Sequence, residues 1–347
     1  MIKPRRLRAG DTVAAISLSW GGPGAMLHRY HEGKRQLMER FGVRVVETPH
    51  ALRDPEWLRR NPQARADDLM GAFADPAIRG IISTIGGEES IRLLPFIDAR
   101  VIRANPKVFV GYSDSTVTHL ACHAAGLVTF YGPAIMAGFA ENTGMFPYMA
   151  DSVHRTMFTA EPPGRVMPNR DGWTAERLDW ADPGNQRRRR TLQPSMPWQF
   201  LSGQAVVTGP LIGGCLEVLS WLRGTPAWPH ATAFEKAILF IETSEEAVPP
   251  AYVARELRVL AAMGILQRLS GLIVGRPGGN IAPERFAEYD RAVLEVVHDE
   301  IGRIDLAVIT QMDFGHTDPF FVLPYGVAAR IDPAAQTFEI VEAAVVD

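Results

Sequence analysis

Residues 108–116 read VFVGYSDST, and this stretch decides the fold. Its first three residues form an apolar run typical of a buried strand, and residues 116–125 carry apolar side chains at helical spacing. Ser113 stands on the sharp turn between them, which would project its hydroxyl from the end of a sheet, beside helix-terminal N–H groups. The turn needs small residues two positions before and after the serine, and Gly111 and Ser115 meet that need, although the second place is usually glycine. The pattern predicts the nucleophile elbow of an acyl-transfer enzyme.

The size and composition are those of an ordinary globular protein. The chain has 347 residues, 46% hydrophobic and 22% charged, which predicts two domains rather than one core. A net charge of −3 gives no reason to expect nucleic acid or a membrane as a partner. No apolar segment follows the basic N-terminus, so we expect no signal peptide and a cytoplasmic location. Cys122 and Cys215 lack metal-ligand spacing and predict no disulfide framework.

Strand and helix signals alternate through the first part of the chain. The expected strands are residues 12–18, 43–48, 78–85 and 107–110, and the expected helices are residues 28–41 and 64–73. This alternation predicts the α/β class, with a mostly parallel N-terminal sheet flanked by helices. Ligands of such sheets gather at the carboxyl ends of the strands, where both Ser113 and the pair Gly86-Gly87 are expected.

A proline-rich segment without periodicity divides the chain. We expect an N-terminal α/β domain at residues 1–158, a connecting segment at 159–197, and a C-terminal mixed α/β domain at 198–347. The expected elements of that last domain are strands at 205–209, 237–241, 271–274 and 307–312, helices at 252–263 and 283–301, and a hairpin of 327–331 with 337–341.

A serine nucleophile needs a base and a group that orients the base. His316 follows an expected strand in a loop marked by glycine and proline, where a sheet would release a functional side chain. Glu242 stands at the carboxyl end of an uncharged apolar run, where a carboxylate needs a partner such as an imidazole N–H. The chain order serine, glutamate, histidine is one that catalytic triads adopt.

Other interpretations remain open for these residues. Ser113 could cap the following helix, His316 could be structural, and Glu242 could pair with an arginine. His119 and His123 lie one helical turn apart without a suitably spaced acidic ligand, so we expect no metal there. The run Arg187–Arg190 is interpreted as a solvated loop, too short to indicate nucleic acid. A non-catalytic, two-lobed protein that binds a small ligand is the alternative of another class, and a single-domain α/β-hydrolase is the alternative fold.

The chain resembles the LD-carboxypeptidase family of serine peptidases, which includes murein tetrapeptide LD-carboxypeptidases and microcin C immunity proteins. The resemblance covers nearly the whole chain. Its blocks are Leu7 with Gly10-Asp11, Arg65-Ala66-Asp67-Asp68, Ile85-Gly86-Gly87, Gly111-Tyr112-Ser113-Asp114, Leu211-Ile212-Gly213-Gly214, Gly224-Thr225 with Pro229, Ile241-Glu242-Thr243-Ser244-Glu245, Gly275-Arg276-Pro277, and Gly315-His316 with Pro324 and Gly326.

The resemblance implies roles for these residues. Ser113 would be the nucleophile, His316 the general base and Glu242 its orienting partner, with Glu245 a less favoured choice for the acid. Backbone N–H groups of Asp114 and of the turn Gly86-Gly87 would form the oxyanion hole. The resemblance further implies an active site at the domain interface and a homodimer, and we expect no cofactor and no metal.

Within the family, the block around Glu242 and a long connection rich in tryptophan look like the microcin C immunity branch, which cleaves an amide in a peptidyl- or aminoacyl-nucleotide analogue. Trp180 would then stack on the nucleobase or, alternatively, pin the connection to the surface. Cys215 replaces a typical asparagine, and Glu88 adds negative charge near the expected substrate entry. An anionic substrate group would need compensation from Arg177 or from the run Arg187–Arg190. The alternative substrate is a murein tetrapeptide in peptidoglycan recycling.

Overall fold

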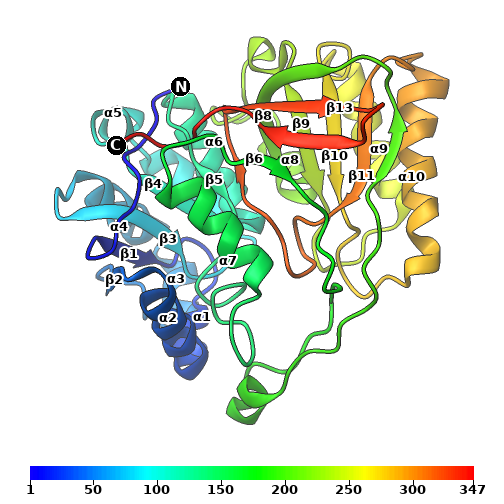
Figure 1. The fold of residues 1–347 in the computed structure, drawn as a ribbon. Coiled ribbons are helices and arrows are strands. Elements are labelled where there is room, and N and C mark those ends of the chain that lie inside the picture. The colour runs from blue at the N-terminus through cyan, green and yellow to red at the C-terminus, as the bar shows by residue number, and fades with distance from the viewer.

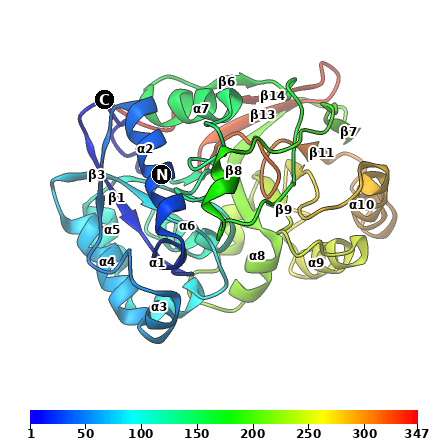
Figure 2. The same ribbon diagram turned by 90° about the horizontal axis from the view of Figure 1, so that it is seen from below.

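The computed structural model describes all 347 residues and contains two sheets in two adjoining lobes. Figure 1 shows the N-terminal part, in blue and cyan, beside the C-terminal part, in yellow and orange, and Figure 2 shows the same separation from below. Both chain ends lie on the N-terminal lobe (Figure 1). There Val346 donates its N–H to the carbonyl of Pro4. The α/β class predicted from the sequence is confirmed.

The first sheet has the strand order β12-β5-β4-β3-β1-β2. All neighbouring strands are parallel except β12, which runs antiparallel to β5. Its strands are β1 (Thr12–Ile16), β2 (Arg44–Glu47), β3 (Ile78–Ser83), β4 (Val108–Gly111), β5 (Phe130–Tyr131) and β12 (Leu323–Pro324). The helices of this lobe are α1 (Gly22–Ala25), α2 (Leu27–Phe41), α3 (Pro55–Arg60), α4 (Pro62–Ala74), α5 (Ala99–Ala104), α6 (Thr116–Ala124) and α7 (Pro147–Val153).

The second sheet has the order β6-β14-β13-β8-β9-β10-β11-β7. The strands β8 to β11 are mutually parallel, and antiparallel strands flank them. Its members are β6 (Gly164–Val166), β7 (Gln199–Ser202), β8 (Val207–Cys215), β9 (Ile238–Glu242), β10 (Gly271–Gly275), β11 (Ala307–Met312), β13 (Ala328–Asp332) and β14 (Thr337–Ile340). The helices are α8 (Leu216–Leu222), α9 (Pro250–Ala262) and α10 (Phe286–Leu294).

Alternation along β1 explains why both faces of the first sheet are covered. Val13 and Ala15 belong to a cluster of 72 buried apolar residues that also takes members from the second sheet. Ala14 and Ile16 point the other way, into a separate cluster beneath α4, α5 and α6. Because successive side chains of a strand point to opposite faces, this short apolar run joins two cores. The larger core ties the lobes together.

Two expected elements differ from the structure. The strand expected at 205–209 is β8, which continues to Cys215 through the pair Gly213-Gly214. Glycine is disfavoured in strands, so the pair Gly213-Gly214 argues against a longer strand. In the structure glycine is required there, because a methyl group on Gly213 would lie 1.7 Å from the carbonyl oxygen of Phe240 on the neighbouring strand. The helix expected at 283–301 is α10 preceded by a 3-10 turn and followed by a π-helical turn at Glu295–Glu300.

Two short strands cross between the expected parts of the chain. β6 lies inside the expected connecting segment and pairs with β14 of the second sheet, whereas β12 comes from the C-terminal part and joins the first sheet. The expected domain limits at 158 and 197 stay predictions. Residues 173–193, here called the strap, form an excursion closed at its base by paired backbone hydrogen bonds between Trp173 and Gln193. None of the helices has the length and apolar character needed to cross a bilayer.

Candidate active site

Ser113 lies on the turn between β4 and α6, as the sequence pattern predicted. Its φ of 60° is a left-handed conformation that is rare for any residue but glycine. The turn is tight, because a methyl group on Gly111 would lie 2.6 Å from Ser115 Oγ and 2.9 Å from Ser83 Cβ. The buried ring of His119 braces the strand end through its Nε2, 2.8 Å from the carbonyl oxygen of Gly111. Strained backbone held by close packing is typical of a functional turn.

The second lobe supplies a histidine–carboxylate pair. Glu242 ends β9 and is fully buried, and His316 lies in the loop that follows β11. His316 Nδ1 is 2.6 Å from Glu242 Oε2. The preceding residue must be glycine, because a methyl group on Gly315, at φ 97°, would lie 2.7 Å from that same oxygen. The two predicted partners from separate strand ends therefore do meet.

Tyr131, the last residue of β5, joins this pair to the serine turn. Its hydroxyl donates to Glu242 Oε1 and accepts the backbone N–H of Ser113 at 3.1 Å. Burial, and then the charge of Glu242, raise the pKa of Tyr131 well above its usual value, so the hydroxyl stays a donor. Each oxygen of the buried carboxylate thus has a donor, one from each lobe. Sequence reasoning missed Tyr131, since β5 is only two residues long.

Glu245 contacts the remaining nitrogen of His316. Its Oε2 is 3.0 Å from His316 Nε2, and its Oε1 is 2.8 Å from Arg177 on the strap. Burial by itself lowers the pKa of His316, but the charges of Glu242 and Glu245 outweigh it and raise the value to about 10. No hydrogen bond joins Ser113 Oγ to His316 in this arrangement. The structure brings the three predicted residues to one site, and Glu245 occupies the nitrogen that would face the serine.

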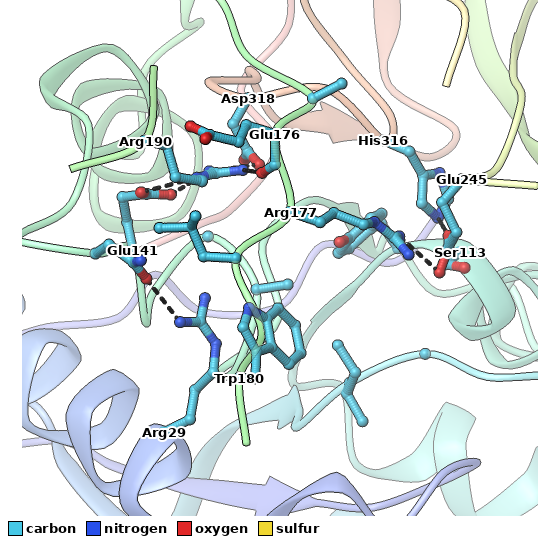
Figure 3. Close-up of a pocket in the computed structure, with 18 of the residues that line it drawn as sticks. Arg29, Ser113, Glu141, Glu176, Arg177, Trp180, Arg190, Glu245, His316 and Asp318 are labelled. Carbon is cyan, nitrogen blue, oxygen red and sulfur yellow. Dashed lines mark hydrogen bonds and ion pairs between the residues drawn. The ribbon is translucent and has the colours of Figure 1, made fainter. Parts of the chain in front are cut away.

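A cavity of about 460 Å³ lies between the lobes and the strap. Figure 3 shows Ser113, His316 and Glu245 grouped on one side of it and Glu141 and Arg190 on the other, with Trp180 between. The strap also contacts the histidine loop, since Thr174 and Asp318 exchange two backbone hydrogen bonds of 2.7 and 2.9 Å. The strap therefore forms one wall of the cavity.

The far side of the cavity carries charged groups that already have partners. Arg29 stacks on Trp180, its guanidinium carbon 4.0 Å from the ring centroid. The same guanidinium donates to the Met136 carbonyl and to the side-chain oxygens of Asn142 and Gln186. Burial lowers the pKa of Arg29 to about 10. This position of Arg29 could not be predicted from the sequence, because nothing in the pattern of α2 separates it from a solvated arginine.

Arg190 is the member of the run Arg187–Arg190 that lines the cavity. It forms an ion pair with Glu141, with one N–O distance of 3.0 Å, and a second with Asp318 at 2.8 Å. Both of its acidic partners line the cavity as well. This side of the cavity therefore carries two positive charges, Arg29 and Arg190, and two negative charges, Glu141 and Asp318. The two signs balance one another inside the protein.

The other predicted site residues are divided between the cavity wall and the interior. Gly86 and Gly87 line the cavity, and a methyl group on Gly86 would lie 3.1 Å from Ser113 Oγ. Asp114 is buried, and its carboxylate accepts the N–H groups of Glu89 and Ser90, which fixes the chain just after that turn. Trp180 and Arg177 line the cavity too.

Glu88 and Cys215 do not line the cavity. Glu88 is exposed on the surface, and its neighbour Glu89 pairs with Arg92. Cys215 is buried with its Sγ 3.4 Å from Glu217 Oε2. Its backbone N–H donates to Thr116 on α6, so the residue helps to join the lobes. The structure gives neither residue a place beside a substrate.

A strained serine stands on a strand-to-helix elbow, and it shares a cavity with a histidine that pairs with a carboxylate of the second sheet. These features define a class of α/β proteins with a hydrolase-type site between two lobes. Comparison with known proteins then identifies the particular family. Residues 13–132 match the LD-carboxypeptidase N-terminal domain and residues 208–331 match the LD-carboxypeptidase C-terminal domain. The chain belongs to the LD-carboxypeptidase family, as its motifs predicted.

Individual relatives are similar to this chain over nearly their full lengths. A Vibrio cholerae protein provisionally assigned as a carboxypeptidase is 30% identical, with 98% of each chain covered. The microcin C7 self-immunity protein MccF of Escherichia coli is 28% identical over 97% of this chain and 94% of its own.

Solved structures give the same result. An MccF-like protein from Streptococcus pneumoniae in complex with AMP is 29% identical, with a TM-score of 0.85 over 95% of this chain and 98% of its own. MccF in complex with glutamyl sulfamoyl guanosine is 26% identical, with a TM-score of 0.82 over 99% of this chain and 100% of its own.

Proposed function

We propose that this protein is a serine hydrolase that cleaves an amide bond in a small peptidyl- or aminoacyl-nucleotide analogue. The observation that carries the proposal is the shared cavity. Ser113 on its strained turn and His316, held by the buried Glu242, lie at one side of the cavity, and Trp180 presents an aromatic ring farther along it. This arrangement suits a ligand with a reacting acyl group at one end and a nucleobase at the other. Relatives with bound AMP and with a bound aminoacyl sulfamoyl nucleoside support this choice of substrate class.

The chemistry follows from the groups at the serine side. Ser113 Oγ attacks the amide carbonyl carbon, and its proton passes to His316 Nε2 while Glu242 holds Nδ1–H. The backbone N–H groups of Asp114 and of the Gly86-Gly87 turn stabilise the oxyanion, at about 3 to 4 kcal/mol per donor. The C–N bond then breaks, His316 returns the proton to the leaving nitrogen, and an acyl group stays on Ser113. Water activated by the same histidine releases the acid and restores the serine.

A fluorophosphonate probe tests the nucleophile without a known substrate. We expect the wild-type protein to be labelled at pH 9 and the Ser113→Ala variant not to be labelled, with the adduct mapped to Ser113 by mass spectrometry. Equal labelling of both proteins would refute the assignment. The substrate class is tested by incubating the protein with aminoacyl sulfamoyl adenosines and with muropeptides, and following product masses with Ser113→Ala as the control. Cleavage of muropeptides alone would favour the murein carboxypeptidase alternative.

A further inference from the structure

Glu245 lies beside His316 at the end of the cavity that holds Ser113. It lies three residues beyond the end of β9, and its side chain, 36% exposed, lines the cavity next to the serine. One carboxylate oxygen contacts His316 Nε2 and the other contacts Arg177 (Figure 3). Burial by itself raises the pKa of Glu245, but these two cationic partners lower it well below the usual value. The group is therefore an anion throughout the neutral range.

The contact with Nε2 has to be released before catalysis. Nδ1 of His316 is occupied by Glu242, so Nε2 is the nitrogen that can take the proton of Ser113. While Glu245 lies 3.0 Å from Nε2, that nitrogen is not available to the serine. Glu245 therefore needs another cationic partner when it leaves, because an unpaired carboxylate in a partly closed cavity is costly.

Within the protein, only Arg177 would remain as a cationic partner for the displaced carboxylate of Glu245. Arg29 and Arg190 lie on the opposite side of the cavity and already bond to interior acceptors. Arg177 is close, but its side chain is 65% exposed on the strap, and exposed ion pairs contribute little. A cation brought by the substrate would complete the charge balance, whereas an anionic acyl group would add a second negative charge beside Glu245.

Distances set where that cation must be. During attack Ser113 Oγ must come within about 3 Å of Nε2, at the hydrogen-bonding position that Glu245 Oε2 holds at 3.0 Å in this structure. The displaced carboxylate therefore stays beside the carbonyl group under attack. The ammonium of a lysine-like side chain of the acyl residue can fold back to that place, whereas the α-ammonium is common to all aminoacyl compounds and does not distinguish one acyl residue from another.

Building on the proposed function, we propose that Glu245 is the specificity-determining residue of the acyl site and that it binds the side-chain ammonium group of the acyl residue. The binding of this group draws the carboxylate away from His316 Nε2 and frees the base. The substrate class is thus narrowed to aminoacyl or peptidyl nucleotide analogues whose acyl residue has a positively charged side chain.

Binding to the Ser113→Ala variant tests this inference without turnover. Calorimetry with lysyl, leucyl and glutamyl sulfamoyl adenosine is expected to give at least tenfold tighter binding of the lysyl compound than of the glutamyl one. Nα-acetyl-lysyl sulfamoyl adenosine separates the two ammonium sources: retained affinity supports binding of the side-chain ammonium, and lost affinity would assign the contact to the α-ammonium and overturn the inference. Glu245→Gln in the same background should remove the preference, and Glu245→Lys should reverse it. The matched control is Glu246→Gln, an exposed neighbour that does not line the cavity and should leave the preference intact.

Equal affinities for all compounds, absence of binding, or a preference that survives Glu245→Gln would each overturn the inference. Fluorophosphonate labelling of the Glu245→Gln variant reports separately on the nucleophile, because no carboxylate holds His316 Nε2 in that protein. A labelled variant, together with a wild-type protein that lacks the charge preference, refutes the role of Glu245 alone, whereas an unlabelled variant refutes the proposed function.

Discussion

Replacing Tyr131 with phenylalanine removes one hydroxyl that contacts both the carboxylate of Glu242 and the backbone N–H of Ser113. A hydrogen bond to a charged group contributes about 1.5 to 3 kcal/mol, and the buried carboxylate has only one other donor, His316. If that energy supports the reactive geometry, the rate of acylation falls roughly 10-fold to 150-fold. The assay is the second-order rate of fluorophosphonate labelling of Ser113, measured from pH 7 to pH 10, alongside urea unfolding of each protein.

Tyr325→Phe is the matched control. Tyr325 is a buried neighbour of Tyr131, with ring centroids 6.4 Å apart, and its hydroxyl donates to the Gly213 carbonyl without a hydrogen bond to Ser113 or Glu242. Both variants should lose similar stability, but only Tyr131→Phe should lose reactivity beyond the fraction unfolded. If Tyr131→Phe is labelled at the wild-type rate, the tyrosine does not position the site and the reasoning fails.

Three further predictions follow from the same site. Ser113→Gly should exceed Ser113→Ala in unfolding free energy by about 1 kcal/mol in urea titrations, because only glycine adopts a φ of 60° without strain; equal values would contradict the strain. Trp180→Ala should weaken AMP binding by about 1 to 3 kcal/mol in calorimetry, since a stacking surface is lost, and unchanged binding would remove the nucleobase from that ring. Glu245→Gln removes an anion from His316, whose pKa is about 10 in the wild type, so the pH midpoint of labelling should move down by about 1 to 3 units. Because labelling requires the neutral imidazole, the variant should react faster than wild type at pH 7.5, and an unshifted or higher midpoint would show that Glu245 does not hold the proton.

The sequence carried enough information to place the strand ends. An apolar run followed by Gly111, Ser113 and Ser115 is specific because only small side chains fit around the turn, and the structure shows atoms within 3 Å of a methyl group placed on Gly111. Glu242 and His316 were predictable because each follows an apolar strand, and parallel strands deliver their carboxyl ends to one edge.

The contacts across the cavity were not predictable from pattern. Tyr131 lies 111 residues from Glu242 in the chain, and the two meet only because the lobes pack together. Arg29 has no sequence feature that separates it from a surface arginine. Cys215 and Glu88 were predicted to contact substrate from their places in the sequence blocks, and the structure places Cys215 in the core and Glu88 on the surface, which sequence pattern alone could not show.

The loop that carries His316 is fastened at both ends to different sheets. It leaves the second sheet at the end of β11 and enters the first sheet at β12, after only ten residues, 313–322. Separation of the two lobes would therefore require the β12–β5 pairing to break or this loop to stretch. We infer that ligands enter by displacement of the strap rather than by a clamshell motion. The loop also connects the two lobes covalently over a short distance, so we expect heating to unfold both lobes in one transition. Tryptophan fluorescence from either lobe should then give the same midpoint temperature.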